Sequence, residues 1–312
     1  MSTDGRNDDT AILLLAYGGP DSLDAVEPYL LDVRGGRHTP PELVEEVRKR
    51  YEAIGGKSPL REITEDVARV LSSRLGQPVY VGMRHWHPYI RDVVLKMVRD
   101  DEIRRVVAIC MAPHYSDQSI GVYRKHLEEA ISAAGTDVDL RFVSEWPVQS
   151  DFIDGLVSST RSAFDKFESD GIFTVFTAHS LPLQGHQSAD PYESQLDQTA
   201  GRIADRLQIP TDRWLRCFQS APRSGARWLG PQLTEVIPKL ADRGERELVI
   251  VPIGFLCDHV EILYDLDIEA LHIARECGVR MERAPMLNCS RSLISALEDL
   301  SRTAIASPRD RE

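Results

Sequence analysis

The chain has 312 residues, of which 42% are hydrophobic and 28% are charged, and its formal net charge is −12. These values are typical of a globular protein and exclude the disordered and fibrous classes. The negative charge disfavours binding to nucleic acid or to an anionic membrane, so an anionic ligand would need a local group of arginines.

The cysteines and the hydrophobic runs indicate in which cellular compartment the protein is found. Five cysteines occur without a C-x-x-C pair, which disfavours a disulfide framework or a local zinc site. The first ten residues, MSTDGRNDDT, lack the basic and apolar regions of a signal peptide. No later run approaches the roughly 18 apolar residues of a membrane span. We therefore expect a cytoplasmic protein without an integral membrane segment.

Short apolar runs, typical of buried strands, alternate with amphipathic helical patterns along the whole chain. The runs lie at 11–17, 78–83, 104–110 and 139–145, and again at 172–178, 213–219, 247–255 and 279–285. Helical patterns lie at 41–52, 62–75, 88–99, 118–134, 151–168, 192–207, 230–242 and 290–306. This alternation predicts an α/β fold of two similar, doubly wound, Rossmann-like domains, each with a four-stranded parallel sheet flanked by helices, and an active-site cleft between them.

The predicted domain boundaries follow from this rhythm. We expect an N-terminal domain at 10–148, with a long helical insertion at 18–77 that forms part of the ligand cleft. A C-terminal domain follows at 149–289, and a last helix at 290–306 is expected to pack back on the N-terminal domain. The insertion is much longer than a minimal crossover, and long additions at the carboxyl ends of strands commonly bind ligands.

Polar side chains gather directly after the predicted strands, where a doubly wound sheet binds its ligand. Tyr17, His114 and His179 each follow a strand, and Glu261, Asp265 and Glu269 follow another at four-residue spacing. Taken alone, three such carboxylates are usually a solvated helix face, and a single histidine is usually a surface residue. Their coincidence at one predicted crevice favours a functional site.

The chemistry of that site is limited by the motifs that the chain lacks. G-x-S-x-G, a Walker loop and the dinucleotide-binding fingerprint are all absent. Imidazole and carboxylate groups suit proton abstraction and the handling of a divalent metal such as Fe(II), which accepts both nitrogen and oxygen ligands.

A series of motifs between about residues 11 and 270 resembles ferrochelatases, most closely the soluble coproporphyrin ferrochelatases of Gram-positive bacteria. These motifs are AYGGP, RYEAIGGKSPL, GMRHWHPYI, APHYS, TAHSLP, DPYESQL, FQSAPRSGARWLGP and GFLCDHVEILYDLDIE. The resemblance implies two chelatase-type Rossmann-like domains facing one cleft, and an enzyme, a lyase, that inserts Fe(II) into a porphyrin with release of two protons.

The resemblance also assigns roles at the centre of the site. It implies that His179 takes a pyrrole proton or coordinates the incoming iron, with Glu261 opposite as a second catalytic and metal-binding group. Asp265 and Glu269 would continue outward as an acidic path for metal ions or protons. Tyr17, from AYGGP, would point into the pocket and ligate iron in the product. Asp258 and His259 are expected only to support the start of the helix.

The same resemblance implies a set of porphyrin- and propionate-binding residues. Besides Tyr17, these are Arg34, Arg50, Ser58, Tyr123, Arg84 and His85. They would supply the arginine cluster that an acidic chain needs for an anionic ligand. The chain departs from its resembled relatives where Arg84-His85 replaces Lys-His, where Gly35 replaces a second arginine, and where Gly19 replaces a threonine.

The resemblance implies a coproporphyrin III ferrochelatase of haem biosynthesis, which gives coprohaem. The alternatives are a protoporphyrin IX ferrochelatase giving protohaem, a non-catalytic tetrapyrrole-binding protein, or a chelatase for cobalt or nickel. We expect Fe(II) as substrate and no tightly bound cofactor; because no cysteine follows Cys289, we expect no iron–sulfur cluster. We also expect a monomer that makes transient contact with neighbouring haem-pathway enzymes.

Overall fold

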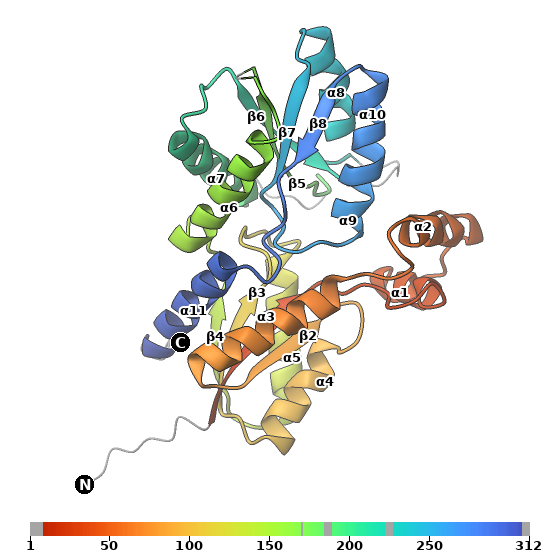
Figure 1. Ribbon diagram of the computed structural model, residues 1–312. Helices are drawn as coiled ribbons and strands as arrows, with labels where there is room; N and C mark the ends of the chain where they lie inside the picture. The colour runs from red at the N-terminus through yellow and green to blue at the C-terminus, as the bar shows by residue number, and fades with distance from the viewer. Residues whose placement is uncertain (1–8, 170, 184–188, 222–226, 308–312) are drawn as a thin grey trace.

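The computed structural model describes residues 9–169, 171–183, 189–221 and 227–307, and it contains two parallel sheets of four strands each (Figure 1). The first has the order β2-β1-β3-β4 and consists of β1 (Thr10–Ala16), β2 (Val79–Met83), β3 (Arg105–Cys110) and β4 (Asp139–Val143). The second has the order β6-β5-β7-β8 and consists of β5 (Phe173–His179), β6 (Trp214–Gln219), β7 (Glu247–Pro252) and β8 (Arg280–Arg283). The predicted fold class is confirmed.

The central strands are buried along almost their whole length and are mostly apolar, since helices cover both faces of each sheet. Every residue of β1 is buried, and Ile12 pairs with Val79 on one side and with Val107 on the other. Such continuous apolar runs are typical of parallel sheets, whose crossovers place helices on both faces. The strands therefore end at shared edges, where the polar side chains that follow them come together.

The helices of the first sheet are α1 (Val26–Val33), α2 (Pro41–Ala53), α3 (Leu60–Leu75), α4 (Ile90–Leu95), the π-helical segment η2 (Lys96–Asp100) and α5 (Ile120–Ala134). Helix α3 packs on the face of β1 that carries Ile12 and Leu14, while α4 and α5 cover the face that carries Leu13 and Leu15. Helices α1 and α2 extend away from this sheet toward the second domain (Figure 1). Within the predicted insertion, α3 is thus the crossover itself, and α1 and α2 are the addition.

The helices of the second half are α6 (Ser150–Phe164), α7 (Tyr192–Leu207), α8 (Leu233–Asp242), α9 (Val260–Leu263), the π-helical segment η3 (Asp265–Ala270), α10 (Leu271–Glu276) and α11 (Arg291–Ala306). Helices α6 and α7 pack on one face of the second sheet, and α8 and α10 on the other. Helix α11 returns to lie against α3, β3, β4 and α6. Within the described residues, no helix combines the length and apolar character that crossing a membrane requires.

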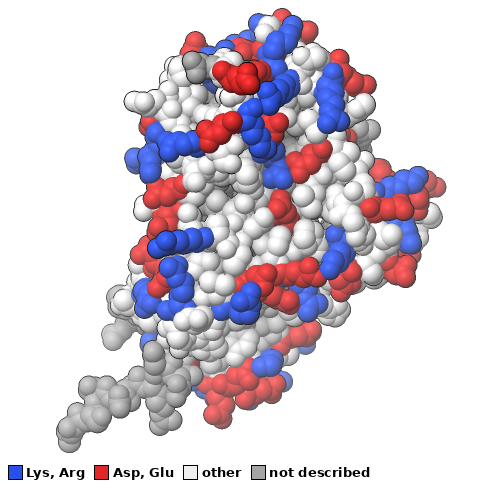
Figure 2. Space-filling model, viewed as in Figure 1, with Lys and Arg blue, Asp and Glu red and all other residues white. Residues whose placement is uncertain are grey.

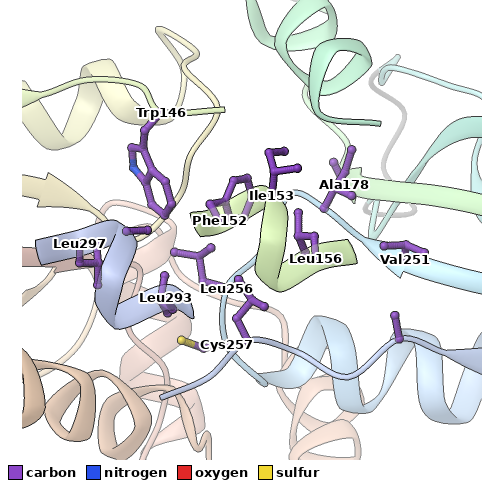
Figure 3. Packing of buried hydrophobic residues seen from close by; sticks show 14 of the residues in the cluster. Trp146, Phe152, Ile153, Leu156, Ala178, Val251, Leu256, Cys257, Leu293 and Leu297 are labelled. Atoms are coloured by element: carbon purple, nitrogen blue, oxygen red, sulfur yellow. The ribbon is translucent and has the colours of Figure 1, made fainter. Parts of the chain in front are cut away.

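One hydrophobic cluster joins the two domains. It contains Leu14 of the first sheet and Phe176 of the second, both fully buried. Figure 3 shows Phe152 of α6 and Leu293 of α11 within this cluster. Each such buried side chain stabilises the folded protein by roughly 1.5–3 kcal/mol. The shared core therefore holds the strand ends of the two sheets around one site.

Candidate active site

A cavity of about 330 Å³ lies at the carboxyl ends of the central strands and is lined by both domains. It has the position that a ligand takes in open α/β sheets. Six of the predicted site residues line it, namely Tyr17, Ser58, Arg84, Tyr123, His179 and Glu261. Apolar side chains such as Leu181, Trp228 and Phe255 supply much of the rest, as expected of a pocket for a largely apolar ligand with a few polar contacts.

His179 and Glu261 face each other inside this cavity. Nε2 of His179 lies 3.5 Å from Oε1 of Glu261, and each side chain is 30% exposed, on surface that borders the cavity. His179 is the last residue of β5, whereas Glu261 lies in the first turn of α9. The structure thus brings together two residues that are 82 positions apart in the sequence (261 minus 179).

A second imidazole, that of His259, also contacts Glu261. Its Nε2 lies 3.5 Å from Oε2 of Glu261, and it lines the cavity. We expected His259 only to support the helix start; its carbonyl does accept the first backbone bonds of α9, but its side chain belongs to the site. Asp258 is a support, since Asn288 donates to its Oδ2 at 2.7 Å. The spacing of His259 and Glu261 was visible in the sequence, but the direction of the imidazole was not.

The hydrogen bonds at Nδ1 set the tautomer of both histidines. Nδ1 of His179 contacts the carbonyl oxygen of Ser180, and Nδ1 of His259 lies 2.9 Å from that of Cys257. Because a carbonyl oxygen only accepts, Nδ1 carries a proton in each ring. Nε2 is therefore the nitrogen that gains or loses a proton, and in both residues it points at Glu261.

The charges at this point favour an ionised carboxylate. Burial raises the pKa of Glu261, but the nearby His179 and the hydrogen bond and charge of His259 outweigh burial and lower that pKa to about 2. Burial lowers the pKa of His259, whereas its hydrogen bond and charge interaction with Glu261 raise it above the ordinary value overall. Glu261 is thereby kept anionic, and its charge favours the protonated form of His259.

The acidic row continues from α9 into the π-helical segment η3. Asp265 is 7% exposed, and Ser220 donates to its Oδ2 at 2.5 Å. Burial, with the charges of Glu261 and Glu269, raises the pKa of Asp265 to about 6 against the hydrogen bond from Ser220. Asp265 is therefore the most enclosed of the three carboxylates. Asp265 and Glu269 do not line the cavity itself.

Tyr17 stands on another wall of the cavity, beside a guanidinium and an imidazole. The guanidinium of Arg84 lies 5.9 Å from the Tyr17 ring centre and 5.6 Å from that of Tyr123. The ring of His85 is 4.6 Å from that of Tyr17, and its Nδ1 lies 2.7 Å from Oδ2 of Asp32. Burial and the charge of Glu261 raise the pKa of Tyr17 to about 12, so its hydroxyl is protonated near neutral pH.

The predicted propionate-binding residues differ in their position relative to the cavity. Ser58 lines the cavity, whereas Arg34 is half-buried outside its lining. Its buried Nε has no hydrogen-bond partner in the described part of the chain. Arg50 also lies outside the lining, where its Nη1 is 3.5 Å from Oδ1 of Asp265. Arg50 therefore joins α2 to the acidic row. Figure 2 shows basic and acidic side chains interspersed over the viewed face.

His114, which the sequence also placed at a strand end, lines the cavity and is held there by a hydrogen bond. It is 2% exposed, and its Nε2 lies 2.8 Å from Oγ1 of Thr199. Burial lowers its pKa to about 3, so the ring is neutral. Tyr192, from the DPYESQL motif, lines the cavity beside it, although the sequence alone assigned it no role.

Comparison with known proteins identifies the group to which this site belongs. The family model described as Ferrochelatase matches residues 9–305. The chain is 39% identical to the ferrochelatase of Herpetosiphon aurantiacus, covering 93% of this chain and 97% of that one. It is 36% identical to the coproporphyrin III ferrochelatase of Geobacillus kaustophilus, covering 92% and 93%.

The solved structures support the same architecture. SirB from Bacillus subtilis with Fe3+ superposes with a TM-score of 0.59 at 10% identity, covering 96% of each chain. CbiX, an enzyme of sirohaem biosynthesis in denitrifying bacteria, superposes with a TM-score of 0.54 at 10% identity, covering 94% of this chain and 99% of that one. These likenesses show the fold alone. The family match and the sequence identities show that the chain belongs to the ferrochelatase family.

Proposed function

We propose that this ferrochelatase inserts Fe(II) into coproporphyrin III and releases coprohaem and two protons, as a lyase of haem biosynthesis. The observation that carries the proposal is the facing pair of His179 and Glu261 within the cavity. Among the relatives are coproporphyrin III ferrochelatases that are 32–36% identical over more than nine-tenths of the chain. The substrate of those relatives supports the choice of coproporphyrin III here.

The pair supplies what metal insertion needs. A porphyrin holds weakly acidic pyrrole N–H groups, so iron enters only when a base close to the ring centre removes those protons. We propose that His179, whose Nε2 faces Glu261 inside the cavity, is this base. The anionic carboxylate of Glu261, 3.5 Å away, stabilises the imidazolium that forms and can also bind Fe(II) as an oxygen donor.

Asp265 can take the protons onward. Its pKa of about 6 is close to that of an imidazole, so a proton passes between the two types of group at little free-energy cost. We propose that Glu261, Asp265 and Glu269 form the path along which protons or iron ions move between the cavity and the surface. Transfer through Asp265, the most buried member of the row, would limit the rate of movement along this path.

The opposite wall would hold the macrocycle. We propose that Tyr17 ligates iron in the product complex and that Arg84, Tyr123 and Ser58 meet propionates, with His85 orienting Tyr17. Arg34 and Arg50 would serve propionates at the mouth of the cavity. Coproporphyrin III carries more propionates than protoporphyrin IX, and a guanidinium binds a carboxylate through paired hydrogen bonds.

The remaining parts of the proposal concern the setting of the reaction. We propose that iron is bound as a substrate without a resident cofactor or iron–sulfur cluster. We also propose a cytoplasmic monomer that meets neighbouring haem-pathway enzymes transiently. Sedimentation of the purified protein tests the monomer, and a stable dimer would contradict it.

The substrate is tested by direct competition. Coproporphyrin III and protoporphyrin IX are supplied at equal concentration with Fe(II), and the two products are separated and counted. We expect coprohaem to dominate. A larger yield of protohaem would overturn the substrate assignment while leaving a ferrochelatase.

A tetrapyrrole carrier is the second candidate, since a carrier would use the same apolar cavity. His179→Ala should abolish iron insertion, by about 100-fold or more for the loss of a general base, while porphyrin affinity stays within about twofold. Equal and negligible turnover in the parent protein and the variant would instead indicate a carrier. Parallel assays with Co(II) and Ni(II) would show whether another metal is preferred.

A further inference from the structure

The loop that follows β3 in the N-terminal domain is seated on the start of α7 in the C-terminal domain. Oγ of Ser116 donates to Oδ2 of Asp190 at 2.8 Å, and the backbone N–H of Asp117 donates to the same oxygen at 3.1 Å. The backbone N–H of Tyr115 donates to Oε1 of Gln195 at 2.7 Å. Ser116 is fully buried. Directed hydrogen bonds thus join the domains beside the shared apolar core.

Asp190 connects this interdomain contact to the interior of the C-terminal domain. Its other oxygen, Oδ1, accepts a hydrogen bond at 3.0 Å from the backbone N–H of Tyr192. Tyr192 is the first residue of α7. The Tyr192 ring is 7% exposed and stacks on Phe218 with ring centres 6.5 Å apart. The two oxygens of one carboxylate therefore serve opposite domains.

The hydroxyl of Tyr192 then reaches the proposed base. It donates to the carbonyl oxygen of His179 at 2.9 Å. His179 is the last residue of β5, and the next peptide is held by the bond from Ser180 N–H to the carbonyl of Gln219 at 2.9 Å. Burial raises the pKa of Tyr192, so this phenol remains a donor. The backbone at His179 is therefore fixed from both sides.

We propose that Asp190 and Tyr192 are positioning residues, which link the seating of the β3–α5 loop to the orientation of His179 toward Glu261. This inference rests on the proposed role of His179 as the base. A ring nitrogen 3.5 Å from its partner is sensitive to small rotations of the backbone that carries it, and misplacement of about 1 Å can cost on the order of 100-fold in rate. The contact between the two domains and the orientation of His179 would then be coupled.

Tyr192→Phe is the direct test because it removes only the hydroxyl and keeps the buried ring. If misplacement of His179 raises the activation free energy by about 1 kcal/mol, the size of one hydrogen bond, the rate falls roughly fivefold. We expect kcat for iron insertion to fall by about five- to tenfold, with KM and affinity for the porphyrin within about twofold. Ser116→Ala, at the far end of the link, should reduce kcat in the same way and by less.

Tyr115→Phe is the matched control. The Tyr115 hydroxyl donates to Oδ1 of Asp117 at 2.7 Å, so this variant loses a side-chain hydrogen bond on the same loop. Every hydrogen bond of the path from Ser116 and Asp117 through Asp190 to His179 keeps both of its partners. It should lower the thermal unfolding midpoint about as much as Tyr192→Phe does and leave kcat unchanged. A drop in kcat in this control equal to that of Tyr192→Phe would overturn the proposal, because any loosening of the structure would then suffice.

The double variant Ser116→Ala/Tyr192→Phe tests whether the two ends act through one path. In a single path the losses do not multiply, and the double variant should resemble Tyr192→Phe. Multiplying losses, or unchanged kcat in Tyr192→Phe, would overturn the link. His179→Ala, assayed alongside, keeps the two proposals apart: full activity in that variant contradicts the proposed function itself, whereas inactivity there with normal Tyr192→Phe contradicts only the link.

Discussion

The two oxygens of Glu261 are shared between two imidazoles, since Oε1 lies 3.5 Å from Nε2 of His179 and Oε2 lies 3.5 Å from Nε2 of His259. The same carboxylate is anchored through its backbone, because Nε2 of Gln219 donates to the Glu261 carbonyl oxygen at 2.7 Å. A carboxylate held in this way stays ionised and in place between the two imidazoles. The resulting expectations concern the acidic row, its pH dependence and the loops that support it.

The acidic row should show a gradient of importance. Glu261→Gln removes the charge that stabilises the imidazolium of His179, so iron insertion should fall by about 100-fold or more. Glu269 lies outside the cavity lining, so Glu269→Gln should change the rate of iron insertion by only about twofold. Steady-state insertion assays at saturating porphyrin measure both. Equal losses in the two variants would show that the row acts as one unit without a gradient.

Asp265 should make stability fall with rising pH over a defined window. Its pKa is raised from 3.8 to about 6 in the folded protein, so the folded state holds the proton more tightly than the unfolded state. The favourable contribution is present below about pH 4 and is lost as pH rises to about 6. In Asp265→Asn this loss disappears, so the variant should gain about 1–3 kcal/mol relative to the parent between pH 4 and pH 7.

Urea unfolding at several pH values measures that difference. The guanidinium of Arg50 retains a partner in the variant, because its Nη2 lies 2.9 Å from Oε1 of Glu46. A stability difference between parent and Asp265→Asn that does not change across this window would mean that the carboxyl of Asp265 titrates normally.

Arg283 should hold the acidic row in register. Its guanidinium binds both carboxylate oxygens of Asp267 at 2.6 and 2.8 Å and lies 3.6 Å from Oδ1 of Asp258, so it braces the segment on both sides of Glu261. Arg283→Lys cannot form the paired bonds. We expect unfolding free energy to fall by about 1–3 kcal/mol and iron insertion to slow. Arg280→Lys, on the same strand but exposed, is the control and should keep the parent rate.

Gly19 should be required for the close approach of two loops at the cavity wall. A Cβ added there would lie 2.7 Å from both Cβ and Oγ of Ser58, so Gly19→Ala should cost about 1–3 kcal/mol by overpacking. Thermal unfolding measures this, and Ser58→Gly in the same chain should restore most of the loss. Gly201→Ala, where the added Cβ meets no described atom within 4 Å outside its own helix, should not destabilise the protein. A stable Gly19→Ala protein would show that the loop moves freely.

The pattern of apolar residues along the sequence was sufficient to predict where the strands lie. Each of the eight predicted strands begins within one residue of the observed one, because a buried parallel strand is a short apolar run bounded by polar residues or glycine. Helix α1 was not predicted, since its sequence VEPYLLDV lacks a capping side chain and carries an early proline. The segment η3 was predicted only as a helix, because carboxylates four residues apart fit an α-helix and a π-helix alike.

The sequence by itself therefore determined the fold class, the family resemblance and the presence of His179 and Glu261 after strand ends, since these depend on local periodicity and on short motifs. Tertiary structure alone decided which nitrogen of His259 faces Glu261, that Arg50 pairs with Asp265, and that Asp190 joins the domains. The physical reason is that side-chain direction, burial and the resulting pKa values depend on residues far apart in the chain, which only packing brings together.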